Sequence, residues 1–123
     1  MLAALRDVHA GWAWVVVIGN GAAGLWALGA ERFPVLRHRA LWWFTAAAQA
    51  AVLVQAVLGV RLLSGRDPEP ARFHMFYGFV ALAAVGILYS YRHQLRSRIH
   101  LLYGLGGLFV TGLAIRAMTI PAG

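Results

Sequence analysis

The sequence contains no cysteine, no lysine and few charged residues of either sign. Its 123 residues include four acidic side chains and eleven arginines, so that only 12% of the chain is charged. Without cysteine, the chain has no disulfide, thiolate zinc site, iron–sulfur cluster or cysteine nucleophile. A soluble domain carries about 25% charged residues, because it must cover its surface with them. The composition therefore excludes a water-soluble single domain.

The scarce charges divide the chain into four apolar stretches. Each is about 20 residues long, and a helix of that length spans a hydrocarbon core of about 30 Å. Backbone groups in lipid must bond internally, so each stretch is predicted to be helical. We expect an all-α integral membrane protein, with one domain over residues 1–123 and four transmembrane helices in an up-down-up-down antiparallel bundle. The predicted spans are residues 10–30, 40–61, 73–92 and 101–120.

The arginines predict how the chain lies in the membrane. The loops around residues 31–39 and 92–100 carry six arginines and one glutamate, whereas the opposite side carries five arginines and three acidic residues. The positive-inside rule places the two basic loops in the cytoplasm and both termini outside the plasma or inner membrane. The net charge of +7 is thus a signal of topology, and the expected partner is the lipid bilayer rather than nucleic acid. Aromatic residues near the span ends predict an interfacial belt: Trp12, Trp14, Trp42, Trp43, Tyr91 and Tyr103.

Residues 15–24 contain the pattern G-x-G-x-x-G after an apolar run. In dinucleotide-binding folds such glycines let a pyrophosphate approach a helix, but here no acidic residue follows at about 20 positions. Small residues spaced by four, as in Gly19, Ala23 and Ala27, instead favour close packing of membrane helices within one chain or between copies. Similar small faces are expected at Ala47, Ala51, Gln55 and Gly59, at Gly86 and Ser90, and at Gly104, Gly106, Gly107 and Gly112.

Three amides lie well inside the predicted spans, at Asn20, Gln49 and Gln55. One interpretation is that they form hydrogen bonds between helices, which is the common role of such residues in membranes. The other is that they line a polar pocket or a pathway for a small substrate. No carboxylate or lysine lies in mid-membrane, so a proton-coupled pump has no obvious relay residue.

The histidines are the residues best suited to bind a cofactor. His9 begins the first span and His74 begins the third, so both are expected at the same membrane face and on diagonal helices. Two imidazoles placed in this way can ligate one haem b iron, a pattern generically similar to multi-span cytochromes b. The other interpretation is that they are ordinary interfacial histidines, as expected for His38, His93 and His100. Arg116 is expected to reach the headgroups, to pair with Asp7 or to hold a haem propionate.

Three classes of function follow from these patterns. The first expectation is a non-catalytic subunit, or an assembly or stabilising factor, of a larger membrane complex. The alternative is a b-type haem bundle for electron transfer, in which His9 and His74 ligate the metal and Arg116 contacts the cofactor. The third is a small oligomeric channel or transporter that uses Asn20, Gln49 and Gln55. An enzyme is not expected, because no nucleophile lies near a base. A homo-oligomer or a larger complex is the expected assembly.

Overall fold

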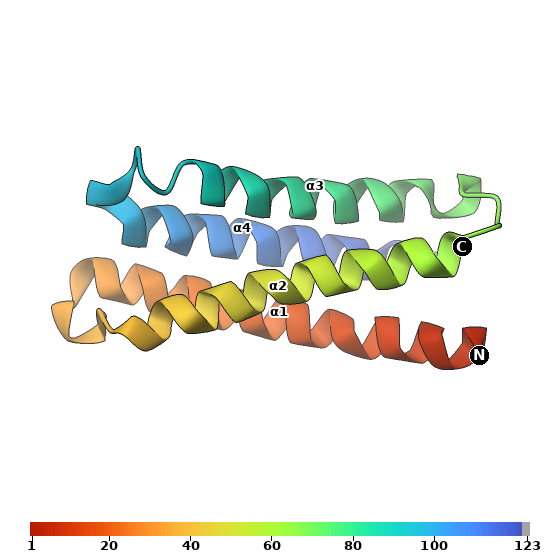
Figure 1. Cartoon of the computed structure of the whole chain (residues 1–123), viewed down its shortest axis with the longest axis horizontal. Coiled ribbons are helices and arrows are strands. Elements are labelled where there is room, and N and C mark those ends of the chain that lie inside the picture. Colours follow the sequence, from red (N-terminus) through yellow and green to blue (C-terminus); the bar gives the residue numbers. More distant parts are fainter. Residues whose placement is uncertain (122–123) are drawn as a thin grey trace.

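The computed structural model describes residues 1–121, and four long helices account for most of them (Figure 1). Each helix is long and apolar enough to cross a membrane. The first helix begins well before residue 10, because the alanines and leucines that precede His9 are strong helix formers. The third helix ends two residues earlier than expected. The helices are α1 (Leu2–Arg32), α2 (Arg39–Leu63), α3 (Arg72–Ser90) and α4 (Ile99–Thr119).

Short connections join the helices, and each contains one turn of 3-10 helix. These turns are Pro34–Leu36, Glu69–Ala71 and Arg96–Arg98. In Figure 1 the connection between α1 and α2 lies beside the connection between α3 and α4. The connection between α2 and α3 lies at the opposite end, together with the start of α1 and the end of α4. The start of α3 is therefore brought close to the start of α1.

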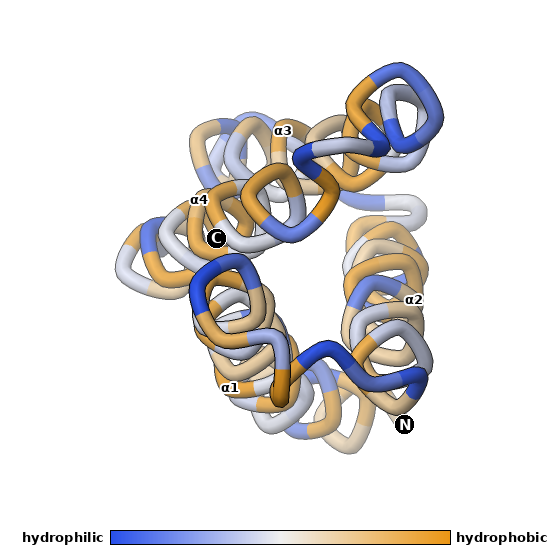
Figure 2. Tube along the Cα trace, turned by 90° about the vertical axis from the view of Figure 1, so that its left-hand side faces the viewer, coloured by the Kyte–Doolittle hydropathy of each residue, from blue (hydrophilic) through white to orange (hydrophobic). Residues whose placement is uncertain are grey.

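The four helices do not pack equally against one another. α1 makes its main contacts with α4 and α2, and α4 also packs on α3, whereas α2 and α3 contact each other much less. The diagonal pairs are therefore α1 with α3 and α2 with α4. Figure 2 shows this arrangement from one end, with hydrophobic colours along the helices and the strongest hydrophilic colours near the turns. The seam between α2 and α3 is the loosest in the bundle.

The interior is built mainly from small side chains, and many large apolar side chains point outward. Ala27 and Ala30 of α1 are completely buried, and Leu41 of α2 is buried beside them. In contrast, Trp43 is 73% exposed and Phe79 is 70% exposed. Lipid is as apolar as leucine, so large side chains gain nothing by facing inward, while small ones let helices approach closely.

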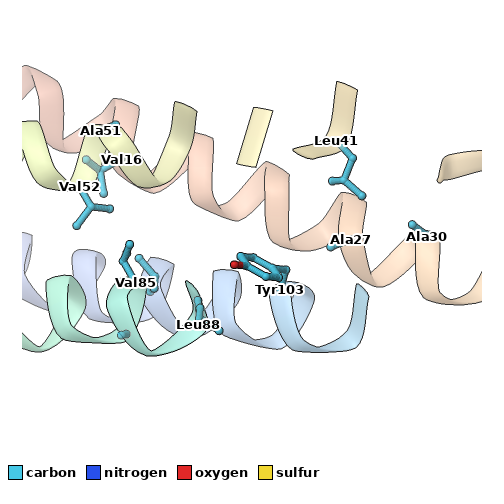
Figure 3. Packing of buried hydrophobic residues seen from close by; sticks show 11 residues of the cluster. Val16, Ala27, Ala30, Leu41, Ala51, Val52, Val85, Leu88 and Tyr103 are labelled. Atoms are coloured by element: carbon cyan, nitrogen blue, oxygen red, sulfur yellow. The ribbon is translucent and has the colours of Figure 1, made fainter. Parts of the chain in front are cut away.

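Tyr103 corrects one expectation from the sequence. It was assigned to the interfacial belt, but its side chain is only 8% exposed and packs within the hydrophobic core. Figure 3 shows the ring projecting from α4 toward the side where α1 and α2 lie. Its ring centroid is 5.5 Å from that of Trp42.

Only some of the predicted small-residue faces pack against another helix of the bundle. Ala23 and Ala27 are buried, and a β-carbon on Gly19 would lie 3.5 Å from that of Ala48 on α2. The face on α3 is different, because Gly86 has open space beside it and Ser90 is exposed. Small residues therefore bring α1 close to α2 and α4, whereas the small face of α3 points away from the bundle.

Candidate functional site

His9 and His74 lie side by side at one end of the bundle. His9 occupies the third turn of α1 and His74 the first turn of α3. Their ring centroids are 6.0 Å apart, and the ring planes make an angle of 73°. Both residues are half-buried. The structure thus brings together, across the diagonal of the bundle, the two histidines that the sequence singled out.

The last turn of α4 fixes the orientation of His74. Nδ1 of His74 lies 2.8 Å from the carbonyl oxygen of Ala117, which also accepts the backbone N–H of Ile120 at 3.3 Å where α4 ends. A carbonyl oxygen can only accept a hydrogen bond, so Nδ1 of His74 must carry the proton. In the neutral imidazole, Nε2 then keeps a free lone pair and is the nitrogen that can bind a metal.

Residues of α2 surround His9. The amide Nε2 of Gln55 donates a hydrogen bond of 2.8 Å to the backbone carbonyl of His9. The edge of the His9 ring faces Gly59, where a β-carbon would lie 3.4 Å from Cε1 and 3.9 Å from Nε2. Together with Ala117, these contacts mean that all four helices contribute to the surroundings of the histidine pair. A glycine at position 59 leaves room beside the His9 ring.

The distance between the two ring centres matches that of two imidazoles that share one metal ion. A metal–imidazole bond is about 2.0 Å long, so two imidazoles on opposite sides of one ion have ring centres about 6 Å apart. Within residues 1–121, no three histidine, aspartate or glutamate side chains come together as a metal site. Two protein ligands are what a six-coordinate haem iron requires, because the porphyrin supplies the other four. The number of histidines in the pair equals this number of protein ligands.

Arg116 lies at the same end of the bundle, one residue before Ala117. Its side chain is exposed, and its guanidinium carbon is 5.8 Å from the ring centroid of Tyr77 on α3. The ion pairs within residues 1–121 join Arg72 to Glu69 and Arg98 to Glu31. Arg116 thus forms no ion pair with a carboxylate within residues 1–121.

Polar side chains inside the bundle tie α1 to α2. Asn20 is only 2% exposed, and its Nδ2 donates to the carbonyls of Val16, at 2.9 Å, and Ala48, at 3.1 Å. The Gln55 bond to His9 acts between the same two helices. Trp12, which the sequence assigned to the interface, makes a third connection, because its indole N–H donates to the Ala51 carbonyl at 2.9 Å.

The third amide of the sequence behaves differently. Gln49 is half-buried, and its side chain forms no hydrogen bond with residues of the described chain. Thr45, one turn earlier on α2, is buried, and its hydroxyl has no partner within residues 1–121. The structure thus assigns Asn20 and Gln55 to inter-helix bonds and leaves Gln49 without one.

The other three histidines have separate surroundings. Nδ1 of His38 accepts the backbone N–H of Ala40 at 3.0 Å and so caps α2. The ring of His100 lies 5.3 Å from that of Trp42. His93 is exposed in the turn between α3 and α4.

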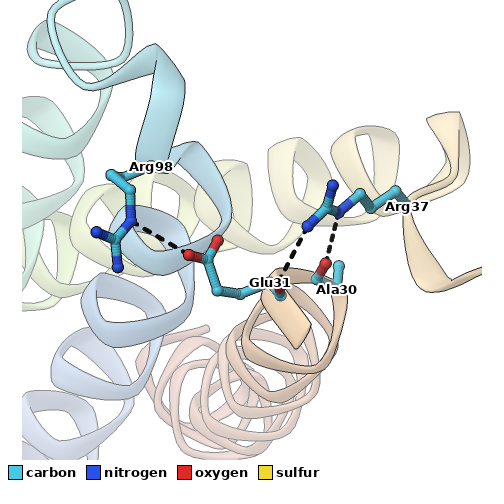
Figure 4. A network of polar contacts seen from close by, with 4 residues as sticks. All are labelled: Ala30, Glu31, Arg37 and Arg98. Atoms are coloured by element: carbon cyan, nitrogen blue, oxygen red, sulfur yellow. Dashed lines mark hydrogen bonds and ion pairs between the residues drawn. The ribbon is translucent and has the colours of Figure 1, made fainter. Parts of the chain in front are cut away.

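Arginines tie the turns together at the end of the bundle opposite to His9 and His74, which the sequence alone did not predict. Arg37 donates to the backbone carbonyls of Ala30, at 2.7 Å, and Glu31, at 3.0 Å, at the end of α1 (Figure 4). The carboxylate of Glu31 pairs with Nε of Arg98 at 3.2 Å. One glutamate thus links the connection between α1 and α2 to that between α3 and α4.

Comparison of the chain with protein-family models, with curated proteins and with solved structures finds no match. Function is therefore inferred from the histidine pair and from the way polar groups are used inside the bundle.

Proposed function

We propose that the chain is an integral protein of the cell membrane that holds a b-type haem between His9 and His74 and takes part in electron transfer. The observation that carries this proposal is the approach of the two rings to 6.0 Å across the bundle. The hydrogen bond from Nδ1 of His74 to Ala117 supports it, because such bonds orient metal-binding histidines and raise their basicity.

The same proposal includes an arrangement in the membrane. The helices would cross it up, down, up and down, with the loops at 31–39 and 92–100 in the cytoplasm and both termini outside. The arginine-rich turns support this orientation. The histidine pair would then lie near the outer surface, at the end opposite to the Glu31–Arg98 ion pair.

The surroundings of the pair suit haem in four ways. His9 and His74 would supply two nitrogen ligands, and Arg116 would supply a cation for a propionate. Gly59 leaves space beside the His9 ring. The loose seam between α2 and α3 would separate more readily than the glycine-rich contact between α1 and α4. When bound between two imidazoles, haem iron supplies one-electron oxidation and reduction.

The visible spectrum tests this proposal directly. The protein is expressed with haem supplied and purified in a mild detergent, and we expect a Soret band and the spectrum of six-coordinate low-spin haem. His9→Ala and His74→Ala should each lose that spectrum, whereas His93→Ala should keep it because His93 is exposed in a turn. A colourless, folded wild-type protein would overturn the proposal.

A second candidate is a non-catalytic subunit, or a stabilising factor, of a larger membrane complex. It is favoured by the outward face of α3, where Gly78 and Gly86 both have open space beside them. Such a face lets another membrane helix approach closely. Co-purification of a stoichiometric partner with a colourless chain would favour this function. The channel or transporter receives no comparable support, because the amides of Asn20 and Gln55 already bond to backbone carbonyls.

A further inference from the structure

Two buried polar atoms near the histidine pair have no hydrogen-bond partner. They are Nδ1 of His9 and Oε1 of Gln55, and both are inaccessible to solvent. A buried polar group without a partner has given up its hydrogen bonds to water without compensation, so two such atoms at one place require an explanation. His9 and Gln55 are already in contact, so a single hydrogen bond between their side chains would satisfy both atoms.

The orientation of the Gln55 amide is determined by its other contact. Its nitrogen faces the backbone carbonyl of His9 at 2.8 Å, where an oxygen would be repelled. Oε1 is therefore the end of the amide that remains free, and it can only accept a hydrogen bond. An imidazole nitrogen that carries a proton is a donor, so the two unsatisfied atoms are complementary.

We propose that Gln55 is a positioning residue for His9, and that Nδ1–H of His9 donates to Oε1 of Gln55 after a small side-chain adjustment. The amide then holds His9 at two points, the backbone carbonyl and the ring. This bond fixes the neutral ring with its proton on Nδ1 and its lone pair on Nε2. Since the Ala117 carbonyl fixes the same tautomer in His74, both rings present Nε2 as the free nitrogen.

The consequence for the iron rests on the proposed function, whereas the tautomer of His9 does not. A hydrogen bond from Nδ1–H raises the basicity of Nε2, and loss of such a contact typically weakens metal binding by about 10-fold to 100-fold. Gln55→Leu removes both hydrogen bonds. Gln55→Glu keeps an acceptor for the ring but loses the donor to the carbonyl. Gln49→Leu is the matched control, because Gln49 lies on the same helix and makes no hydrogen bond within residues 1–121.

The first experiment uses the haem-free protein. Histidine labelled with ¹⁵N is incorporated, and the His9 signals are assigned by their loss in His9→Ala. We expect the nitrogen shifts of wild-type His9 to show a protonated Nδ1 and an unprotonated Nε2, with a mixture of tautomers in Gln55→Leu. A proton on Nε2 in the wild type would overturn the assignment, whether or not haem binds.

The second experiment uses the haem-loaded protein. Gln55→Leu should raise the reduction potential and speed haem loss by about tenfold, because Nε2 becomes a weaker ligand. Gln55→Glu should lower the potential, and Gln49→Leu should leave it unchanged. Equal reduction potentials in wild type, Gln55→Leu and Gln55→Glu would show that Gln55 acts only by packing and does not position His9. A protein that binds no haem would instead refute the proposed function and leave the tautomer result standing.

Discussion

Gly24 of α1 lies directly against Gly107 of α4. A β-carbon on Gly107 would lie 3.0 Å from the α-carbon of Gly24, and a β-carbon on Gly24 would lie 3.0 Å from the backbone nitrogen of Leu108. The neighbouring atoms belong to the backbone, so they cannot move aside as a flexible side chain can. The contact between α1 and α4, the most extensive in the bundle, therefore depends on glycine at both positions.

The first prediction concerns this contact. Gly107→Leu should separate α1 from α4 and lower the free energy of unfolding by roughly 3 kcal/mol, the upper end of the usual overpacking cost. Gly112→Leu is the control on the same helix, because Gly112 has open space beside it. Thermal unfolding in detergent, followed by circular dichroism, compares the two variants. Equal melting temperatures would show that the close contact does not limit stability.

The second prediction concerns the hydrogen bonds between α1 and α2. Asn20→Leu removes the donor to Ala48 and puts a bulkier apolar side chain of the same length at a position that is only 2% exposed. We expect a loss of about 1 kcal/mol, since inter-helix hydrogen bonds in membranes contribute about 0.6 kcal/mol on average. Gln49→Leu should be neutral or slightly stabilising. Reversible unfolding in mixed micelles measures both variants, and a larger effect at Gln49 would contradict the assigned roles.

Part of this structure can be predicted from the sequence because membranes impose strict rules. The length of an apolar stretch fixes a spanning helix, so the four charge-free segments predict α1 to α4 with errors confined to their ends. The short connections also place His9 and His74 at the same end of the bundle. That deduction needs only the order of the helices and the position of each residue along its helix.

The remaining features depend on helix rotation, which composition does not specify. The stripe of Gly19, Ala23 and Ala27 packs as predicted, but the backbone contact of Gly24 with α4 lies on a different side of α1 and was not predicted. The sequence predicts an interfacial position for Trp12, but the orientation of α1 about its axis places the indole N–H at the Ala51 carbonyl. Contacts with backbone carbonyls, such as that of His74 with Ala117, leave no pattern in the sequence.

The third prediction separates the two roles of the arginines at the turns. Glu31→Gln removes an ion pair whose Arg98 side chain is 62% exposed, so it should cost between about 0 and 1 kcal/mol and matter less at high salt. Arg37→Ala should cost more, roughly 1–2 kcal/mol, because it leaves two carbonyls at the end of α1 without their donor. Melting temperatures at low and high salt test this order. A larger effect of Glu31→Gln at both salt concentrations would reverse it.

The last prediction tests the space beside the His9 ring without changing a ligand. At Gly59 a β-carbon alone would make an ordinary contact of 3.4 Å with Cε1, so Gly59→Ala should be tolerated. Gly59→Leu would extend further toward Nε2, which lies 3.9 Å from that β-carbon position, and should exclude haem. Gly78→Leu is the control, because Gly78 on α3 has nothing within 4 Å. The ratio of haem to protein should stay near the wild-type value in Gly59→Ala and Gly78→Leu and fall close to background in Gly59→Leu. Circular dichroism confirms that the helices remain in each variant. Full haem occupancy in a folded Gly59→Leu would mean that the cofactor does not approach His9 from the side of α2.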